Sequence, residues 1–230
     1  MNRPRTGLKR AYNHIVYLLH NPDFFLPRTR GVVHVGGHVA QERQLYAKYG
    51  LNVLWIEPIE ENFTQLIQGI VAFPKQRALR RLITDVDDQE YPFHVSNNTG
   101  ASSSILDLGK HKQVWPKVGY IKTLMFKSVT LSTLFKREQI DMSLYDALVM
   151  DTQGSELLVL KGAETLLSNF KFIKTEAANF EMYKGGCQLR DLDNFLEGRA
   201  FRRIRTVRIK GKMGVGTVYD AVYTSMPEGA

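Results

Sequence analysis

Short apolar runs alternate with helical patterns along most of this chain, and this alternation limits the fold more than any other feature of the sequence. Such an order is typical of βαβ units, in which crossover helices join parallel strands. The run ending at Met150 is continuously apolar, as expected for a central strand buried on both faces. The sequence predicts strands over residues 31–35, 52–56, 77–84, 93–96, 146–150 and 172–177, and helices over 39–49, 60–70, 131–138, 157–167 and 189–197.

The C-terminal part of the chain departs from this alternation. Two strand-like runs, 201–209 and 217–224, are separated by the glycine-rich segment 210–216. This order predicts an antiparallel hairpin that closes an otherwise parallel sheet. Residues 97–126 have the weakest periodicity, so we expect them to form a long loop beside the functional site.

The chain is long enough for one substantial core, and no linker or repeat marks a second domain. It has 230 residues, of which 43% are hydrophobic. We expect a single α/β domain over residues 31–230, preceded by a basic helical appendage over residues 1–30. The single cysteine, Cys187, cannot form an internal disulfide, which suits a reducing cytoplasm. No apolar run approaches the about 18 residues of a membrane span.

Positive charge gathers at the two ends of the chain and gives a net charge of +8. Such clusters attract nucleic acid, anionic lipid or an acidic glycan, and they are equally consistent with a solvated basic surface. Few aromatic residues are interleaved with them, so single-stranded nucleic acid is the weaker of these expectations. The oligomeric state stays open. The basic residues are Arg3, Arg5, Lys9, Arg10, Arg28 and Arg30 at one end, and Arg199, Arg202, Arg203, Arg205, Arg208, Lys210 and Lys212 at the other.

Paired glycines end the first expected strand and precede a helical pattern. Gly36 and Gly37 let the backbone turn sharply and approach a ligand closely. They do not form G-x-G-x-x-G, so a pyrophosphate is disfavoured and a cofactor without phosphates, S-adenosylmethionine, is expected. Glu57 ends the second strand about 20 residues later, where a carboxylate can accept both hydrogen bonds of a ribose diol. Alternatively, Glu57 caps the helix that starts near Glu60.

Other polar residues are placed to complete such a site. Asp85, after the third expected strand, either reaches the exocyclic amine of adenine or belongs to a turn with Asp87 and Asp88. Ser103, within the run 102–104, either contacts the cofactor or the acceptor or lies in a polar loop. Asp151 follows the central strand, at the carboxyl edge of the sheet where open α/β folds bind ligands. We expect the reaction centre there.

Three residues are candidates for moving a proton during catalysis. Asp151 and Glu176 follow or end neighbouring parallel strands, so their carboxyl groups are expected to face each other. Either one acts as a general base, or the two share a divalent cation such as Mg²⁺ or Mn²⁺. Alternatively, Glu176 is a buried acid that pairs with Lys174 or with a loop amide. His38 is suited to act as a base or to contact the cofactor carboxylate, although a lone histidine often satisfies local backbone groups.

From Gly31 to Thr224 the sequence resembles the FkbM family of methyltransferases. The resemblance rests on four blocks: Val35-Gly36-Gly37-His38-Val39-Ala40-Gln41-Glu42, Ile56-Glu57-Pro58, Ala101-Ser102-Ser103-Ser104 and the run from Met150 to Ala163. It implies a class I methyltransferase fold, Rossmann-like, with a mostly parallel seven-stranded sheet, helices on both faces and a C-terminal antiparallel hairpin. It also implies S-adenosylmethionine-dependent O-methylation of a sugar, glycan or natural product. The sequence departs from the family at Gln153, where Glu is more common, and at His38, where Asn is common.

Two other functions compete with this expectation. A ribose 2′-O-methyltransferase acting on RNA would use an Asp and a Lys such as Asp151 and Lys174, although a complete Lys-Asp-Lys-Glu set is missing. A methyltransferase fold that only binds its cofactor is the non-enzymatic alternative. The glycine pair, Glu57 and Asp151 argue against that alternative, because a binding module does not need an acid at the reaction centre.

Overall fold

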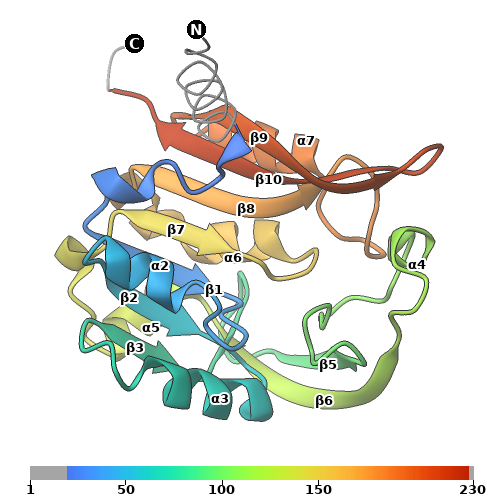
Figure 1. The fold of residues 1–230 in the computed structure, drawn as a ribbon, viewed down its shortest axis with the longest axis horizontal. Coiled ribbons are helices and arrows are strands. Elements are labelled where there is room, and N and C mark those ends of the chain that lie inside the picture. The colour runs from blue at the N-terminus through green and yellow to red at the C-terminus, as the bar shows by residue number, and fades with distance from the viewer. Residues whose placement is uncertain (1–19, 228–230) are drawn as a thin grey trace, which may run out of the picture.

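A seven-stranded, mostly parallel sheet forms the centre of the computed structural model, which describes residues 20–227 (Figure 1). Its order is β3-β2-β1-β7-β8-β10-β9, and β10 runs antiparallel to both of its neighbours. The predicted class I methyltransferase fold, with its C-terminal hairpin, is therefore confirmed. The strands are β1 (Gly31–Val35), β2 (Asn52–Ile56), β3 (Gln76–Leu79), β7 (Ala147–Met150), β8 (Phe172–Ala178), β9 (Phe201–Lys212) and β10 (Gly216–Ser225).

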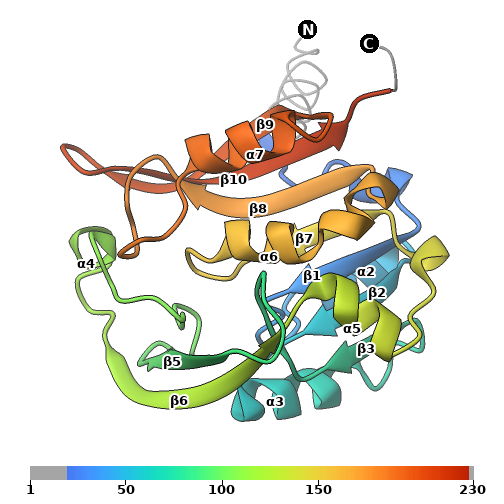
Figure 2. The same ribbon diagram turned by 180° about the vertical axis from the view of Figure 1, so that it is seen from behind.

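Helices cover both faces of this sheet because alternate residues of the strands point to opposite sides (Figures 1 and 2). On one face, α2 (Arg43–Lys48) and α3 (Glu60–Ile70) pack on a core that includes Trp55 and Phe172. On the other face, α5 (Leu131–Arg137), α6 (Glu156–Gly162) and α7 (Leu189–Glu197) pack on a core that includes Leu148 and Ile173. Short 3-10 helices lie at Leu26–Arg28 (η1), Met142–Leu144 (η2) and Glu164–Asn169 (η3).

A second, three-stranded sheet stands beside the first and corrects the expectation of a long loop. Its order is β4-β6-β5, and its strands are β4 (Leu82–Ile83), β5 (Glu90–Ser96) and β6 (Tyr120–Val129). The expected loop 97–126 was wrong from Tyr120 onward, and it also contains the short helix α4 (His111–Val114). Most of the side chains of β6 before Ser128 are exposed, so its sequence lacks the apolar alternation that reveals a half-buried strand.

Several expected elements have different bounds, and three of them show a clear structural difference. The third strand, 77–84, divides into β3 and β4, which belong to different sheets. The helix expected over 39–49 begins only at Arg43, because His38 and Ala40 have the positive φ angles of 46° and 54° that interrupt a right-handed helix. The helix expected over 157–167 ends at Gly162 and is followed by η3; a Cβ at Gly162 would collide with the carbonyl oxygen of Thr84.

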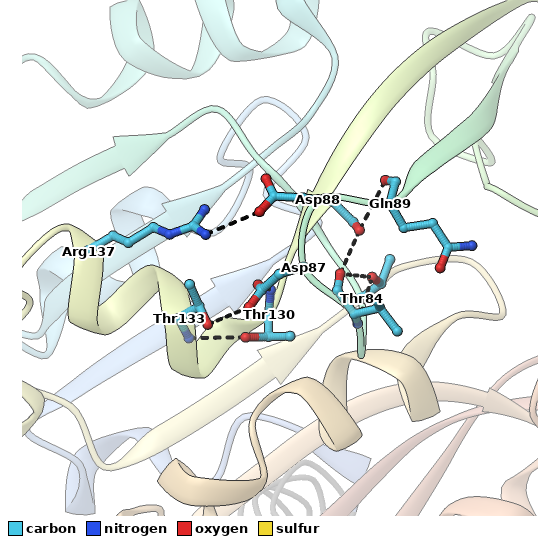
Figure 3. A network of polar contacts seen from close by, with 9 residues as sticks. Thr84, Asp87, Asp88, Gln89, Thr130, Thr133 and Arg137 are labelled. Carbon is cyan, nitrogen blue, oxygen red and sulfur yellow. Dashed lines mark hydrogen bonds and ion pairs between the residues drawn. The ribbon is translucent and has the colours of Figure 1, made fainter.

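A polar network fixes the turn between β4 and β5 to the start of α5 (Figure 3). The carboxylate of Asp87 accepts hydrogen bonds from the Thr130 backbone N–H and the Thr133 hydroxyl, both at 2.7 Å. The side chain of Thr130 caps α5 by accepting a hydrogen bond from the backbone N–H of Thr133. Arg137 forms an ion pair with Asp88 at 3.3 Å. The two aspartates that follow Asp85 therefore hold the junction between the two sheets.

The described part of the N-terminal segment is built into the core. Phe25 and Leu26 are fully buried, and the ring of Phe25 lies 5.3 Å from that of Phe172. The division of the chain at residue 30 stays a prediction, and the helix expected before residue 20 lies outside the described residues. Among residues 20–227, no helix is long and apolar enough to cross a membrane.

Candidate functional site

A pocket opens at the carboxyl ends of β1, β2 and β7, the edge at which the sequence places the site. The second sheet and the segment after β5 supply its far wall. The pocket is lined by His34, Gly36, Gly37, His38, Gln41 and Glu42 around the first turn, by Glu57, Pro58 and Ile59 after β2, by Asp151, Thr152, Gln153 and Ser155 after β7, and by Arg81, Leu82, Ile83, Phe93, Gly100, Ala101 and Ser103 opposite, among others.

The paired glycines form a tight turn against the ends of β2 and β7. The backbone N–H groups of Gly36 and Gly37 both donate to the carbonyl of Ile56, at 2.9 and 3.0 Å. Gly36 has a φ of +83°, and a Cβ there would collide with the carbonyl oxygen of Asp151. Only glycine suits this position, because the backbone conformation is left-handed and the backbone of Asp151 leaves no room for a side chain. Gly36, Gly37, His38 and Glu57 are called the glycine-turn cluster below.

Glu57 is the buried acid of the glycine-turn cluster, with 4% of its surface exposed. One carboxyl oxygen accepts from the backbone N–H of His38 and the other from that of Ile59, both at 2.9 Å. Burial nevertheless raises the pKa of Glu57 to about 7. These hydrogen bonds fix the direction of the carboxyl group, and its position in the pocket wall leaves room for further donors from a ligand.

Two polar atoms in the pocket wall lack partners within the described residues. They are Nδ1 of His38 and the hydroxyl oxygen of Thr152, and both are shielded from solvent. The other ring nitrogen of His38 lies 2.8 Å from the carbonyl oxygen of Thr99. Buried polar atoms are normally paired, so this pocket suits a ligand that brings polar groups of its own. A nucleoside with an amino-acid chain, as in S-adenosylmethionine, fits that requirement.

Side chains rather than backbone groups organise the other half of the pocket edge. Gln153 adopts a φ of +55°, and its amide donates to the carboxylate of Asp151 and accepts from the hydroxyl of Tyr183. The next residue, Gly154, has a φ of +98°, and a Cβ there would approach the Tyr183 ring to 2.9 Å. This turn therefore places an amide between an acid and a tyrosine.

Parallel pairing of β7 and β8 brings the two candidate catalytic acids together. Met150 pairs with Thr175, so Asp151 and Glu176 are the next positions along the two strands. Burial raises the pKa of both carboxyl groups, and their mutual repulsion raises that of Glu176 further. Hydrogen bonding from Gln153 acts in the opposite direction on both. The side chain of Asp151 is open to the pocket although protein surrounds it.

A third acid belongs to this group and comes from the hairpin. Asp220 on β10 pairs in register with Glu176, so the two side chains share one face of the sheet. We call Asp151, Gln153, Glu176 and Asp220 the carboxyl cluster. The alternative pairing of Glu176 with Lys174 is wrong: Lys174 contacts Asp23 at 2.7 Å and Asp220 at 4.0 Å.

The remaining predicted residues occupy different positions. Asp85 is not among the residues that line the pocket. Ser103 lines it, but its hydroxyl accepts from the backbone N–H of Ser96 at 3.0 Å. Their roles toward a cofactor stay predictions.

Several residues of the site were missed from the sequence. Tyr183 and Asp220 lie far along the chain from Asp151, and neither of them was assigned a role from the sequence. Gln153 was noticed only as a departure from a family pattern, and Glu42 carried no signal of its own. Among residues 20–227, no group of three or more histidine, cysteine, aspartate or glutamate side chains is arranged to hold a metal ion.

Comparison with known proteins adds a family and a fold. The model of the methyltransferase FkbM domain matches residues 34–203. Comparison with curated protein sequences finds no match. Among solved structures, TrmK of M. capricolum with bound S-adenosylhomocysteine aligns at a TM-score of 0.50 and 7% identity, covering 94% of this chain and 67% of that chain. Magnesium protoporphyrin IX methyltransferase of Synechocystis PCC 6803 aligns at a TM-score of 0.47 and 12% identity, covering 95% and 84%.

Proposed function

The chain belongs to the FkbM family of S-adenosylmethionine-dependent methyltransferases, and we propose that it methylates a hydroxyl group of a sugar, glycan or natural product. The observation that carries this proposal is the carboxyl cluster beside the glycine turn. Asp151 and Glu176 stand side by side at the edge of the sheet, and both have raised pKa values. Such a pair can hold and accept protons near neutral pH, which suits an alcohol acceptor.

In this proposal the glycine-turn cluster holds the cofactor. Glu57 accepts hydrogen bonds from the ribose diol, while the glycines allow the backbone to approach the ligand closely. Nδ1 of His38 and the hydroxyl of Thr152 are available for the polar groups of the amino-acid chain. When bound, S-adenosylmethionine supplies an electrophilic methyl group. Ser103 and Asp85 are proposed as weaker contributors on the adenine side, and Asp85 would have to move to reach the pocket.

In the same proposal the carboxyl cluster orients and deprotonates the acceptor hydroxyl. Repulsion between Asp151 and Glu176 favours one ionised and one protonated carboxyl, so one accepts the proton of the acceptor hydroxyl and the other donates a hydrogen bond that orients it. The acceptor oxygen forms its bond to the methyl carbon as the bond from that carbon to sulfur breaks, with the electron pair left on sulfur. Gln153 positions Asp151 through its amide. His38 remains the alternative base.

A divalent cation held by Asp151 and Glu176 is the other form of the chemistry predicted from the sequence. The donor set fits it poorly, because the amide nitrogen of Gln153 is directed at the carboxylate of Asp151 and an amide nitrogen is not a ligand for Mg²⁺ or Mn²⁺. The proposed proton transfer therefore uses the carboxyl groups of Asp151 and Glu176 themselves.

RNA is the second candidate acceptor, favoured by the net charge of +8. The carboxyl cluster argues against it, since three acids in one group repel the phosphates beside a ribose hydroxyl. Lys174, the lysine that such an enzyme would need, is already paired with Asp23 and Asp220. A polyol without phosphate meets no such repulsion, and carboxyl groups hydrogen-bond well to its hydroxyls.

The test is transfer of a labelled methyl group from S-adenosylmethionine to separated cell fractions of glycans, small molecules and RNA. The Asp151→Asn variant provides the background. We expect a glycan or small-molecule fraction to carry the label as a methyl ether, which survives alkali. Label confined to RNA would reverse the order of the two candidates. Tight cofactor binding with no fraction labelled would favour the binding module.

A further inference from the structure

The hairpin formed by β9 and β10 extends well beyond the rest of the sheet, with α4 beneath its far end (Figures 1 and 2). The two elements are in contact, because the ammonium group of Lys210 lies 5.1 Å from the centre of the Trp115 ring, just after α4. Six exposed cations gather here: Lys110, Lys112 and Lys117 around α4, and Arg208, Lys210 and Lys212 on β9. We call these six residues and the tip of the hairpin the basic tip surface.

The charges of the basic tip surface are not neutralised locally. None of the six cations forms an ion pair with a carboxylate among residues 20–227. By contrast, Arg203, also on β9, pairs with Asp193 at 3.0 Å. Basic residues on an edge strand discourage pairing with another sheet, and this explains part of the positive charge of β9. The lysines around α4 do not lie on an edge strand, so this reason does not apply to them.

The same hairpin also carries exposed apolar side chains. Met213, at the tip of the hairpin, has 97% of its surface exposed, and Ile209 has 44% exposed. An apolar side chain among unpaired cations is the arrangement that peripheral membrane proteins use, because the cations contact lipid phosphates while the apolar group enters the interface. We propose that the basic tip surface docks this protein on an anionic lipid bilayer.

Nucleic acid fits this surface less well than a bilayer does. Sequence-tolerant binding of single strands uses exposed aromatic rings on which bases stack. The Trp115 ring is not open in that way: it stacks on His111 with 4.8 Å between centroids, and Lys210 lies over it. A base also gains nothing from an exposed methionine at the end of a hairpin, whereas a bilayer offers it an apolar environment.

The basic tip surface adjoins the pocket without overlapping it. His111 packs against Tyr183 at 5.3 Å between ring centroids, and Tyr183 donates its hydroxyl hydrogen to Gln153 of the carboxyl cluster. The side chains of His111 and Tyr183 therefore connect this surface to the carboxyl cluster. Docking itself does not depend on the proposed function, because it can be measured without turnover.

The test is cosedimentation of the full chain with vesicles of phosphatidylcholine alone and with added phosphatidylglycerol. We expect binding only to the anionic vesicles, weakening as salt is added. Replacing Lys112, Lys117 and Lys212 together by Gln should weaken binding about 100-fold, at roughly fivefold for each lysine near the surface. The matched control changes Lys48, Lys136 and Lys161, which are exposed on α2, α5 and α6, to Gln and loses the same charge. It should weaken binding less than tenfold.

A second pair of variants tests whether the hairpin tip contacts the bilayer. Met213→Asp removes the apolar tip, while Val71→Asp makes the same charge change at a valine that is 80% exposed after α3. We expect Met213→Asp to weaken vesicle binding more than Val71→Asp does. Equal losses within either matched pair, or no binding of the wild type to anionic vesicles at low salt, would overturn the proposal. So would tighter binding to RNA than to vesicles with no effect of Met213→Asp.

Discussion

The glycine-turn cluster and the carboxyl cluster lie at the same edge of one sheet, but different parts of the chain hold their acids in place. In the glycine-turn cluster, both oxygens of Glu57 accept from backbone N–H groups. In the carboxyl cluster, Asp151 depends on the side chain of Gln153, which in turn depends on the hydroxyl of Tyr183. Backbone groups withstand most substitutions, whereas a chain of side chains fails when one member is changed.

The clusters also differ in what surrounds each charge. Burial is the main cause of the raised pKa of Glu57, and repulsion from Asp151 contributes less. Asp151, Glu176 and Asp220 lie close together, so repulsion adds to the effect of desolvation on their pKa values. A single buried acid with fixed donors suits binding, and several acids that compete for protons suit proton transfer. The following predictions test this difference, beginning with the largest effect.

Removing the charge of either central acid should affect turnover most. For Asp151→Asn and for Glu176→Gln we expect kcat to fall roughly 10²–10⁴-fold, because general-base catalysis acts in the transition state. Affinity for S-adenosylhomocysteine should change only a few-fold. Steady-state kinetics and calorimetry measure the two quantities. Asp220→Asn is the control, since Asp220 is also paired with Lys174 and is expected to matter less.

Chelation distinguishes the two forms of this chemistry. Acid–base catalysis by Asp151 and Glu176 predicts turnover that survives a chelator. Loss of turnover that Mg²⁺ or Mn²⁺ restores would instead establish the shared cation. For the preceding prediction, a fall in cofactor affinity as large as the fall in kcat in both Asp151→Asn and Glu176→Gln would contradict the assignment of separate binding and proton-transfer roles to the two clusters.

The pH dependence of folding should report the burial of Glu57. Its pKa is raised from 4.5 to about 7, so its contribution to stability is fully present below about pH 4.5 and is lost as the pH rises through 7. The size is at most about 3 kcal/mol. In Glu57→Gln this part of the slope disappears, so the free energy of unfolding should fall less between pH 5 and 8 than in the wild type. Denaturant unfolding across that range measures it.

The ionisation of His34 makes the free energy of unfolding depend on pH in the opposite direction, so its effect must be separated from that of Glu57. Burial and the nearby Lys174 lower the pKa of His34 to about 3, so its contribution is present above pH 6.5 and is lost as the pH falls below that value. The difference between wild type and Glu57→Gln cancels the effect of His34. An unchanged slope in Glu57→Gln would mean that Glu57 is ionised in the folded protein throughout this range.

Cofactor affinity should depend on Glu57 and not on the carboxyl cluster. Glu57→Ala is expected to weaken binding of S-adenosylhomocysteine by about 1–3 kcal/mol, since ligand hydroxyls lose a buried acceptor. Donation to the carboxylate favours its ionised form, so wild-type binding should release protons below about pH 7 and strengthen as the pH rises. Calorimetry in buffers of different ionisation enthalpy detects the protons. Unchanged affinity in Glu57→Ala would remove Glu57 from the site.

The two clusters also differ in how far the sequence predicts them. The glycine turn and Glu57 follow from a strand, two adjacent glycines and an acid at the end of the next strand. Asp151 and Glu176 were predicted to be neighbours from strand order alone, and the register confirms it. Strand order does not predict the positions of Asp220 and Tyr183. Asp220 joins the carboxyl cluster through the antiparallel register of β10, and Tyr183 joins it because its loop packs on Gly154.

The same limit explains the errors in the fold. Short strands whose residues are all buried, such as β1 and β7, were found because continuous apolar runs identify them. β6 was missed because most of its side chains are exposed, and its pairing with β5 depends on backbone hydrogen bonds that leave no pattern in the sequence. The positive φ of His38 and Ala40, which delays α2, likewise has no signal in residues that are not glycine.

The smallest predicted effect tests whether side chains far from one another in the sequence tune the carboxyl cluster. Tyr183→Phe removes the hydroxyl that fixes the Gln153 amide, so Gln153 should donate less reliably to Asp151. We expect kcat to fall about tenfold, with little change in cofactor affinity. Because donation from Gln153 lowers the carboxyl pKa, its loss should shift the acid limb of the pH–rate profile to higher pH.

The control is Tyr120→Phe, which removes a hydroxyl that donates to the carbonyl of Leu106 at 2.6 Å. Both variants should lose about 1 kcal/mol of stability, but only Tyr183→Phe should move the pH profile. If the two profiles move together, or neither moves, Gln153 does not position the acid and the carboxyl cluster is held by backbone packing, as the glycine-turn cluster is.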